Sequence, residues 1–294
     1  MIRVGWIGLG AMGAPMAACL ARAGHSVLAY DIVPERAAAL APDGVRAAET
    51  IAAAVGGADV AVFMVATPDQ LEEALFGPDG AAGPGGALPA GAVAAITATV
   101  GPEAVVSAAT RLADRGVAVV DAPVSGGVQR AAAGDLLIMV SGAAGPVERA
   151  QPVLGALARR APVVGPSPGD GQRMKLVNQL LCGVHIAAAA EALAFAEALG
   201  LQAADCWDVL RDGAAASFMF EDRGARMVAG QFGPARSALD IFVKDMGLVG
   251  DAAEQAGASV PLTAVAQRLY ERGHELGLGR LDDSALIEVL RANR

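Results

Sequence analysis

Cysteine and histidine are scarce in this chain of 294 residues, with three of each. Cys19, Cys182 and Cys206 lie far apart, and their spacing is neither that of a disulfide framework nor that of a zinc site. No cluster of histidine, cysteine and aspartate has the spacing of metal ligands, so we expect no bound metal. The scattered cysteines suit a reducing compartment, and we expect the protein to be cytoplasmic.

Positive charge and aromatic side chains are also in short supply. The 31 Asp and Glu residues outnumber 22 Lys and Arg, and the net charge of −9 argues against nucleic acid or an anionic membrane as a partner. The N-terminal residues lack the basic and then apolar pattern of a signal peptide. The apolar run 180–201 is long enough to span a bilayer, but it carries His185, Glu191 and Glu197 and lacks interfacial aromatics. We therefore expect a buried helix of a soluble protein.

Strand-like and helix-like segments alternate in the first half of the chain. We expect strands at residues 3–7, 26–30, 60–65, 93–96, 118–121, 136–141 and 161–164. We expect helices at residues 11–23, 34–40, 102–115 and 146–157. Strands separated by helices of this length predict an α/β fold with a parallel, doubly wound sheet.

A glycine-rich loop, Gly8-Leu9-Gly10-Ala11-Met12-Gly13, joins the first expected strand to the first expected helix. In such a loop the first glycine allows a tight turn, the second lets the backbone approach a pyrophosphate, and the third lets helix pack on strand. The phosphate then binds N–H groups at the start of the helix. Asp31 ends the second strand, where an acid accepts the ribose hydroxyls of NAD and repels the 2′-phosphate of NADP. We predict a Rossmann-type NAD site; the alternatives are an ordinary tight turn and, for Asp31, a helix cap.

Strand signals stop after Pro168, and the remaining chain is almost wholly helical. The change in composition and the run Gly165-Pro-Ser-Pro-Gly169 place a domain boundary near residue 166. We expect residues 1–166 to bind NAD. Residues 167–294 are expected to form an all-α domain built on a long interdomain helix, and the resemblance described below implies that this domain serves substrate binding and oligomerisation.

A second glycine-containing loop, Asp121-Ala-Pro-Val-Ser-Gly-Gly127, follows the strand 118–121. It lies at the carboxyl edge of the sheet, where ligands of doubly wound folds bind. The Ser125 hydroxyl beside the N–H groups of Gly126 and Gly127 makes an anion nest suited to a substrate carboxylate. The alternative is a glycine turn capped by Ser125.

Lys175 stands directly before the apolar run, and we expect it in the first turn of the helix there. A cation is disfavoured near the positive end of the helix dipole. Burial lowers the pKa of a lysine below its reference of about 10.4, towards values useful for proton transfer. Both points favour a catalytic role in proton transfer.

Together these segments resemble the β-hydroxyacid dehydrogenase family, which includes 3-hydroxyisobutyrate dehydrogenase and tartronate semialdehyde reductase. The shared motifs are the glycine loop with Met12, the run ending at Gly127, the Gly-x-Gly-x-x-x-Lys segment ending at Lys175, and Lys244-Asp245. The chain is most similar to the L-threonate dehydrogenase branch in segments 175–181, 183–191, 217–223 and 240–248. The resemblance covers essentially the whole chain and implies a C-terminal domain like that of 6-phosphogluconate dehydrogenase and a homodimer or homotetramer.

The resemblance, together with the loops, implies two sets of site residues. Those for the cofactor are Gly8, Leu9, Gly10, Ala11, Met12, Gly13, Asp31, Thr67, Thr99 and Lys244. Those for the substrate are Ser125, Gly126, Gly127, Asn178 and Gln179, with Lys175 as the general acid and base. Gln179 departs from the family, because many relatives carry Asn there, and the longer amide changes the expected depth of the substrate pocket.

We therefore expect an NAD-dependent dehydrogenase that oxidises the CH–OH group of a small hydroxy acid, a sugar acid such as L-threonate, to the oxo acid. Activity on 3-hydroxyisobutyrate or tartronate semialdehyde is the alternative within the family. An imine reductase shares the fold but usually carries Asp or Tyr where Lys175 stands. A non-catalytic dinucleotide-binding scaffold would be free to lose this lysine.

Overall fold

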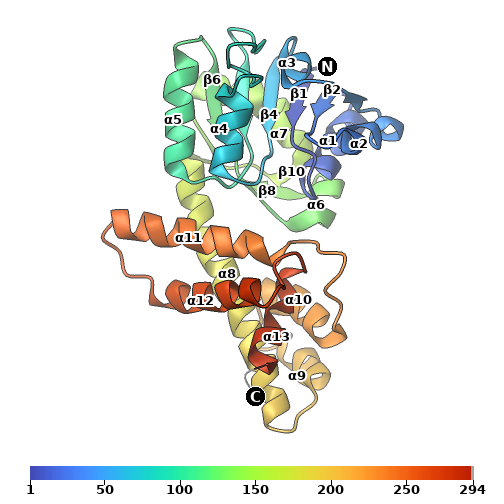
Figure 1. Ribbon diagram of the computed structural model, residues 1–294, viewed down its shortest axis with the longest axis vertical. Helices are drawn as coiled ribbons and strands as arrows, with labels where there is room; N and C mark the ends of the chain where they lie inside the picture. The colour runs from blue at the N-terminus through green and yellow to red at the C-terminus, as the bar shows by residue number, and fades with distance from the viewer. Residues whose placement is uncertain (293–294) are drawn as a thin grey trace. The chain divides into compact units, whose positions relative to one another are not determined.

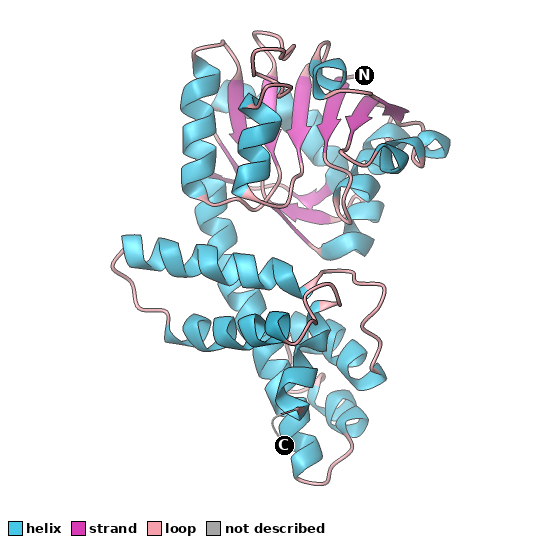
Figure 2. Ribbon diagram, in the orientation of Figure 1, coloured by secondary structure: helices cyan, strands magenta, loops and turns pink. Residues whose placement is uncertain are grey.

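The structure is a computed structural model that describes residues 1–292. It divides into two compact units, Met1–Lys175 and the chain from Leu176 onward. The first unit holds the strands, and the described part of the second holds helices and loops without a strand (Figures 1 and 2).

An eight-stranded sheet lies at the centre of the first unit, in the order β11-β9-β6-β5-β4-β1-β2-β3. Its strands are β1 (Arg3–Ile7), β2 (Ser26–Tyr30), β3 (Arg46–Ala47), β4 (Val60–Phe63), β5 (Val93–Ile96), β6 (Ala118–Asp121), β9 (Val140–Ser141) and β11 (Val163–Gly165). Every neighbouring pair is parallel except β6 and β9. The strand order changes direction at β1, and dinucleotides bind at such a switch point. The predicted Rossmann-type sheet is confirmed.

Helices cover both faces of this sheet (Figure 2). They are α1 (Gly13–Arg22), α2 (Pro34–Ala38), α3 (Ile51–Val55), α4 (Pro68–Phe76), α5 (Pro102–Ala113), α6 (Gly127–Ala133) and α7 (Ala144–Leu157), with a short 3-10 helix η1 (Ala41–Asp43). Neighbouring residues of one strand enter different apolar clusters, as Trp6 and Ile7 do in β1. Because both faces are buried, the strands are almost continuously apolar.

The expected single strand at residues 136–141 is wrong in detail. The structure has β8 (Leu136–Ile138) and β9 there, and β8 belongs to a second sheet of order β10-β8-β7, with β7 (Val124–Ser125) and β10 (Ala158–Arg160). Pro162, which lacks a backbone N–H, separates β10 from β11, so the strand expected at 161–164 begins at Val163. Strands of two or three residues carry too little alternation to be found from sequence.

The second unit begins within α8 (Asp170–Ala198). It continues with α9 (Ala203–Leu210), α10 (Phe218–Ala229), α11 (Leu239–Gln255), α12 (Pro261–Glu275), the 3-10 helix η2 (Asp283–Ala285) and α13 (Leu286–Arg291). Its core includes Ile186, Met246 and Tyr270. α11 packs closely on α8 at Gly183, where an added Cβ would lie 2.6 Å from the sulfur of Met246.

The start of α8 differs from the prediction in a way that bears on Lys175. Counted from Asp170, Lys175 is the sixth residue of the helix, so it lies in the second turn rather than the first. The expected dipole penalty is therefore wrong, because the effect of the macrodipole falls off within the first turn. The expected burial is confirmed, since Lys175 is only 6% exposed.

By length and composition alone, α8 could also cross a membrane. Half of its most apolar window is buried inside the protein, as in the core helix of a soluble protein.

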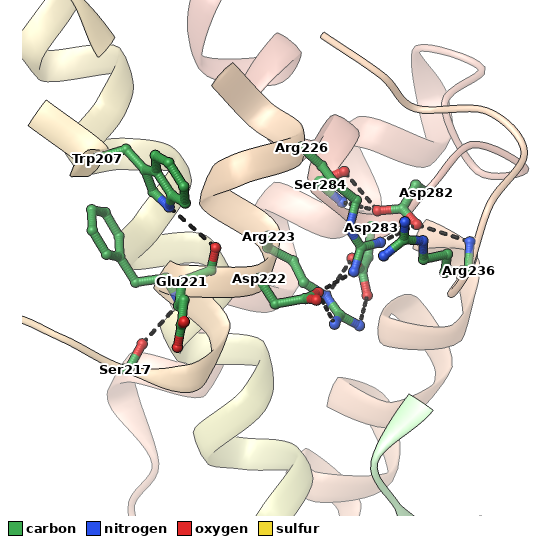
Figure 3. A network of polar contacts seen from close by, with 11 residues as sticks. Trp207, Ser217, Glu221, Asp222, Arg223, Arg226, Arg236, Asp282, Asp283 and Ser284 are labelled. Carbon is green, nitrogen blue, oxygen red and sulfur yellow. Dashed lines mark hydrogen bonds and ion pairs between the residues drawn. The ribbon is translucent and has the colours of Figure 1, made fainter. Parts of the chain in front are cut away.

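A network of ion pairs joins α10 to the segment that precedes α13 (Figure 3). The Arg223 guanidinium donates to both carboxylate oxygens of Asp283, at 3.0 and 3.1 Å, and Asp283 is fully buried. Arg226 donates to Asp282 at 2.5 Å and also to Asp222. Burial raises the pKa of Asp283, while Arg223 opposes that shift. These pairs hold the segment that contains Asp282 and Asp283 against α10.

Candidate functional site

The glycine loop after β1 has the local geometry that its three glycines predict. Gly8 has φ +96°, and a Cβ there would lie 2.4 Å from the Met64 carbonyl oxygen. A Cβ on Gly13, the first residue of α1, would lie 2.1 Å from the Gly8 carbonyl oxygen. A Cβ on Gly10 would meet no heavy atom within 4 Å. Gly8 and Gly13 therefore serve the fold, whereas Gly10 leaves open space where a phosphate group could approach the backbone.

Asp31 connects the end of β2 to this loop. Its carboxylate is buried and accepts hydrogen bonds from the Leu9 N–H at 2.6 Å and the Val33 N–H at 2.9 Å. The half-exposed Arg36 guanidinium forms an ion pair with it at 3.3 Å. The carboxylate thus holds the glycine loop in place at the edge of the sheet where β1 and β2 end.

Thr67 lies beyond the end of β4 and caps α4. Its hydroxyl accepts a hydrogen bond from the Gln70 N–H at 3.1 Å. The strands β1, β2 and β4 are neighbours and parallel, so the loops that follow them lie at one edge of the sheet. The structure therefore brings the glycine loop, Asp31 and Thr67 to the same edge.

Ser125 is the last residue of β7, and Gly126 and Gly127 follow it into α6. Both glycines have positive φ, +143° and +76°. A Cβ on Gly126 would lie 3.0 Å from side-chain carbons of Arg130 and Leu136, while Gly127 faces open space. This backbone shape requires glycine and leaves room beside Gly127.

A buried polar cluster that the sequence analysis did not assign to the site lies at the end of β6. The Asp121 carboxylate accepts hydrogen bonds from the Gly169 N–H at 3.0 Å, the Gln172 N–H at 2.9 Å and the Gln172 side-chain amide at 2.8 Å. The Ser141 hydroxyl donates a further bond to it at 3.2 Å. Burial raises the pKa of Asp121, and the bonds from Gln172 oppose that shift.

Gln172 extends this cluster to the loop after β5, which contains Thr99. Its side-chain oxygen accepts from the Val100 N–H at 3.0 Å and the Gly101 N–H at 3.1 Å, and its amide donates to the Ala98 carbonyl at 3.0 Å. Gln172 is fully buried. The sequence signal for this cluster was an acid directly after an apolar strand and a glutamine between glycines and the candidate lysine.

Asn178 and Gln179 belong to a second polar chain, in the helical unit. The Asn178 amide donates to the Gln179 side-chain oxygen at 2.8 Å, and the Gln179 amide donates to Asp245 on α11. Asp245 also pairs with the Lys244 ammonium at 2.8 Å. The oxygen and the nitrogen of the Gln179 side chain thus both bond to protein groups. Asp245 connects this pair of amides to Lys244, so three candidate residues belong to one polar chain.

Two family profiles match consecutive parts of this chain. The profile described as the NAD binding domain of 6-phosphogluconate dehydrogenase matches residues 3–165. The profile described as NAD-binding of NADP-dependent 3-hydroxyisobutyrate dehydrogenase matches residues 169–290. The L-threonate dehydrogenase of Cupriavidus necator is 40% identical over 286 residues, which are 97% of this chain and 95% of that protein. The chain belongs to the 3-hydroxyisobutyrate dehydrogenase-like family of β-hydroxyacid dehydrogenases.

Two further relatives show the breadth of this family. The 2-hydroxy-3-oxopropionate reductase of Escherichia coli is 34% identical, covering 98% of this chain and 97% of that protein. The crystal structure of 3-hydroxyisobutyrate dehydrogenase from Salmonella typhimurium superposes with a TM-score of 0.90 at 35% identity, covering 98% of this chain and all of that one. The family resemblance predicted from the motifs is confirmed. The protein is an NAD(P)-dependent hydroxyacid dehydrogenase that acts on a CH–OH group, from a soluble enzyme family.

Proposed function

We propose that this dehydrogenase oxidises a small sugar acid such as L-threonate to the oxo acid, with NAD as the cofactor and Lys175 as the general acid and base. The observation that carries the proposal is the burial of Lys175, a cation in a helix that begins among the loops of the Rossmann-type sheet. The 40% identity to an L-threonate dehydrogenase supports the choice of substrate. A 3-hydroxyisobutyrate dehydrogenase or a 2-hydroxy-3-oxopropionate reductase is the second candidate, supported by the relatives of those names.

The proposed division of work follows the residues. The Ser125 hydroxyl and the N–H groups of Gly126 and Gly127 hold the substrate carboxylate. Neutral Lys175 takes the proton of the substrate hydroxyl, and in the reverse direction its ammonium form returns it. Positioned acid–base catalysis of this kind contributes about 10²–10⁴-fold. Asn178 and Gln179 orient the lysine and a substrate hydroxyl.

The residues of the first unit fit a dinucleotide. Gly10 leaves space for a pyrophosphate, and Asp31 lies where it can accept ribose hydroxyls. A dinucleotide held by these residues would supply the acceptor for the hydride of the substrate carbinol carbon. We propose that the loop residues 8–13, Thr67, Thr99 and Lys244 complete the cofactor site.

The role of Lys175 is tested by Lys175→Met, which removes the amine and keeps an unbranched apolar side chain. We expect turnover to be lost while the Kd for NADH stays within about twofold of wild type, because the lysine acts on the substrate proton. Arg173→Met is the matched control: the same substitution on an exposed cation of the same helix, and it should retain activity. Turnover by Lys175→Met close to that of wild type contradicts the assignment.

Substrate choice is tested by following NADH formation at alkaline pH with C3–C6 hydroxy acids. The panel includes L-threonate, D-glycerate, 3-hydroxyisobutyrate and L-serine. We expect the highest kcat/KM for L-threonate; a higher value for 3-hydroxyisobutyrate favours the second candidate.

Cofactor choice depends on Asp31, because a buried carboxylate at the end of β2 repels a 2′-phosphate. Arg36 favours the opposite choice, NADP, since its half-exposed guanidinium lies beside Asp31 and could pair with a 2′-phosphate. We expect wild type to have a higher kcat/KM with NAD than with NADP and Asp31→Ser to reduce that ratio. A wild-type preference for NADP contradicts the proposal.

We further propose that residues 1–166 carry the cofactor and residues 167–294 carry substrate contacts and the subunit interface.

Exposed apolar side chains recur at seven-residue steps along α8, at Met174, Leu181 and Phe195, with Ala188 between them. Such a stripe suits a helix that packs against a second copy, and we propose a homodimer or homotetramer. Light scattering after size-exclusion chromatography should show a smaller particle for Phe195→Glu than for wild type. The three cysteines lie far apart in the sequence, without the spacing of a disulfide framework, and support a reducing, cytoplasmic location.

A further inference from the structure

The beginning of α8 is held by side chains from distant parts of the first unit. Where a side chain caps the start of a helix, it is usually a Ser, Thr, Asp or Asn at the N-cap position itself. Here the N–H groups of Gly169 and Gln172 bond to Asp121, which is 48 and 51 residues away. The Gly171 N–H bonds to the Ser141 hydroxyl at 2.8 Å, 30 residues away.

The contacts around this helix start allow little movement. A Cβ on Gly171 would lie 2.6 Å from the Met139 carbonyl oxygen and 2.8 Å from an Asp121 oxygen. Asp121, Ser141 and Gln172 are each 0% exposed, so bulk water does not reach their hydrogen bonds. The first turn of α8 is therefore fixed in position and rotation on the ends of β6 and β9.

Gln172 and Asp121 also connect the start of α8 to the two loops that we propose bind ligands, the Thr99 loop and the Ser125 loop. Gln172 bonds to the backbone of residues 98, 100 and 101, which flank Thr99. Asp121 is the residue that begins the loop to Ser125, four residues on. Lys175 follows Gln172 by three residues, so the two lie on the same side of the helix one turn apart.

We propose that Asp121 and Gln172 are positioning residues that set Lys175 against the Thr99 and Ser125 loops. This inference rests on the proposed role of Lys175 in catalysis. Burial of an ionised carboxylate opposes folding, and burial raises the pKa of Asp121, so removal of its charge need not unfold the protein. What the carboxylate supplies is an acceptor for four donors at one point, which no apolar side chain can provide.

Asp121→Asn is the most direct test, because it keeps the size of the side chain. The Asn oxygen can still accept from the two backbone N–H groups, but its NH₂ then faces the NH₂ of Gln172, where a 2.8 Å hydrogen bond stood. Two donors at that distance repel and displace the helix start. A shift of about 1 Å in a catalytic group costs on the order of 10²-fold in rate.

We therefore expect kcat of Asp121→Asn to fall by about 10–100-fold while the Kd for NADH changes less than threefold. The double variant Asp121→Asn/Gln172→Glu restores a donor facing an acceptor between residues 121 and 172, and the Glu oxygen can still accept from the N–H groups of residues 100 and 101. The bond to the Ala98 carbonyl, 3.0 Å in wild type, is lost, so the double variant should recover only part of kcat. Gln172→Glu alone places two carboxylates side by side and should be at least as impaired as Asp121→Asn.

A spectroscopic readout is independent of turnover. The sequence contains two lysines, Lys175 and Lys244, so protein labelled with ¹³C-lysine gives two side-chain Cε signals that Lys175→Met assigns. We expect Asp121→Asn to move the Lys175 signal and to leave the Lys244 signal in place. The double variant should return the Lys175 signal towards its wild-type position.

Leu112→Ala is the control for lost stability alone. Leu112 is fully buried in α5 and bonds through its carbonyl to Val117, before β6 begins, at the opposite end of that strand from Asp121. The cavity it leaves should lower the free energy of unfolding and should move neither kcat nor the Lys175 signal.

The positioning role is overturned if folded Asp121→Asn keeps wild-type kcat and an unmoved Lys175 signal. Failure of the proposed function looks different. In that case wild type turns over no hydroxy acid of the panel, while the Lys175 signal still reports whether Asp121 positions the lysine.

Discussion

The glycine loop allows a prediction that separates cofactor binding from folding. Gly10 and Gly13 differ by three residues, and both have backbone angles outside the positive-φ region, so alanine is sterically allowed by the backbone at each. Only the surroundings differ: open space at Gly10, and the Gly8 carbonyl oxygen 2.1 Å from a Cβ at Gly13. Gly10→Ala should therefore weaken cofactor binding without loss of stability, whereas Gly13→Ala should lower the stability of the fold.

Gly10→Ala should fold at least as well as wild type. Loss of glycine entropy in the unfolded chain stabilises a compatible site by about 0.4–1 kcal/mol. If a pyrophosphate packs on this backbone, the added methyl group costs about 1–3 kcal/mol in the complex. At about 1.4 kcal/mol per tenfold, the Kd for NADH should rise by roughly 5–140-fold.

Gly13→Ala should be destabilised before any ligand binds. A contact of 2.1 Å forces α1 away from the loop, with an expected cost of about 1–3 kcal/mol in the free energy of unfolding. In each variant, urea denaturation measures the free energy of unfolding, and titration of NADH fluorescence measures the Kd for NADH.

Gly145→Ala is the matched control. Gly145 also faces open space without positive φ, but it lies in the first turn of α7, which follows β9. It should gain stability like Gly10→Ala without a change in the Kd for NADH. If Gly10→Ala binds NADH as tightly as Gly145→Ala does, the open space at Gly10 is not where the phosphate lies.

Two further predictions concern the ion pairs of the helical unit (Figure 3). Arg223→Met leaves the fully buried Asp283 carboxylate without its bidentate partner, and we expect a loss of about 3–5 kcal/mol in unfolding free energy. Urea denaturation that shows less than about 1 kcal/mol refutes this assignment. Asp282 accepts bonds from Ser284, Arg236 and Arg226, and its pKa is lowered in the folded protein. Its contribution is therefore complete above the unfolded pKa of about 3.9 and is lost as pH falls through the lower folded value. The difference in Tm between wild type and Asp282→Asn should be constant near neutral pH and shrink below about pH 4; a difference that grows on acidification contradicts the sign.

Most of the large elements followed from the sequence because their signals are local. The strands at 3–7, 26–30, 93–96 and 118–121 agree with the structure residue by residue, since each is an apolar run bounded by turn residues. The short helices α3, α4 and α6 were missed, as was β3 with two residues, because such elements are stabilised by packing rather than by their own periodicity.

The candidate site divides in the same way. The glycine loop, Asp31, the Ser125 loop and Lys175 stood out because each is an unusual residue for its place in a strand-and-helix pattern. Gln179 stood out as a departure from relatives, but its bond to Asp245 was not predictable, since Asp245 lies 66 residues away. Asp121 was visible only as the first residue of a loop.

The sequence by itself determined the class of fold, the loop that approaches a dinucleotide and the lysine buried in α8. Those properties depend on residue types at short spacing, where sterics and hydrophobic periodicity act along the chain. Only the tertiary structure decided that α8 begins at Asp170, and that its first turn is capped by Asp121 and Ser141. A buried hydrogen bond between residues some 50 positions apart leaves no local pattern, because its partners meet only when the sheet has formed.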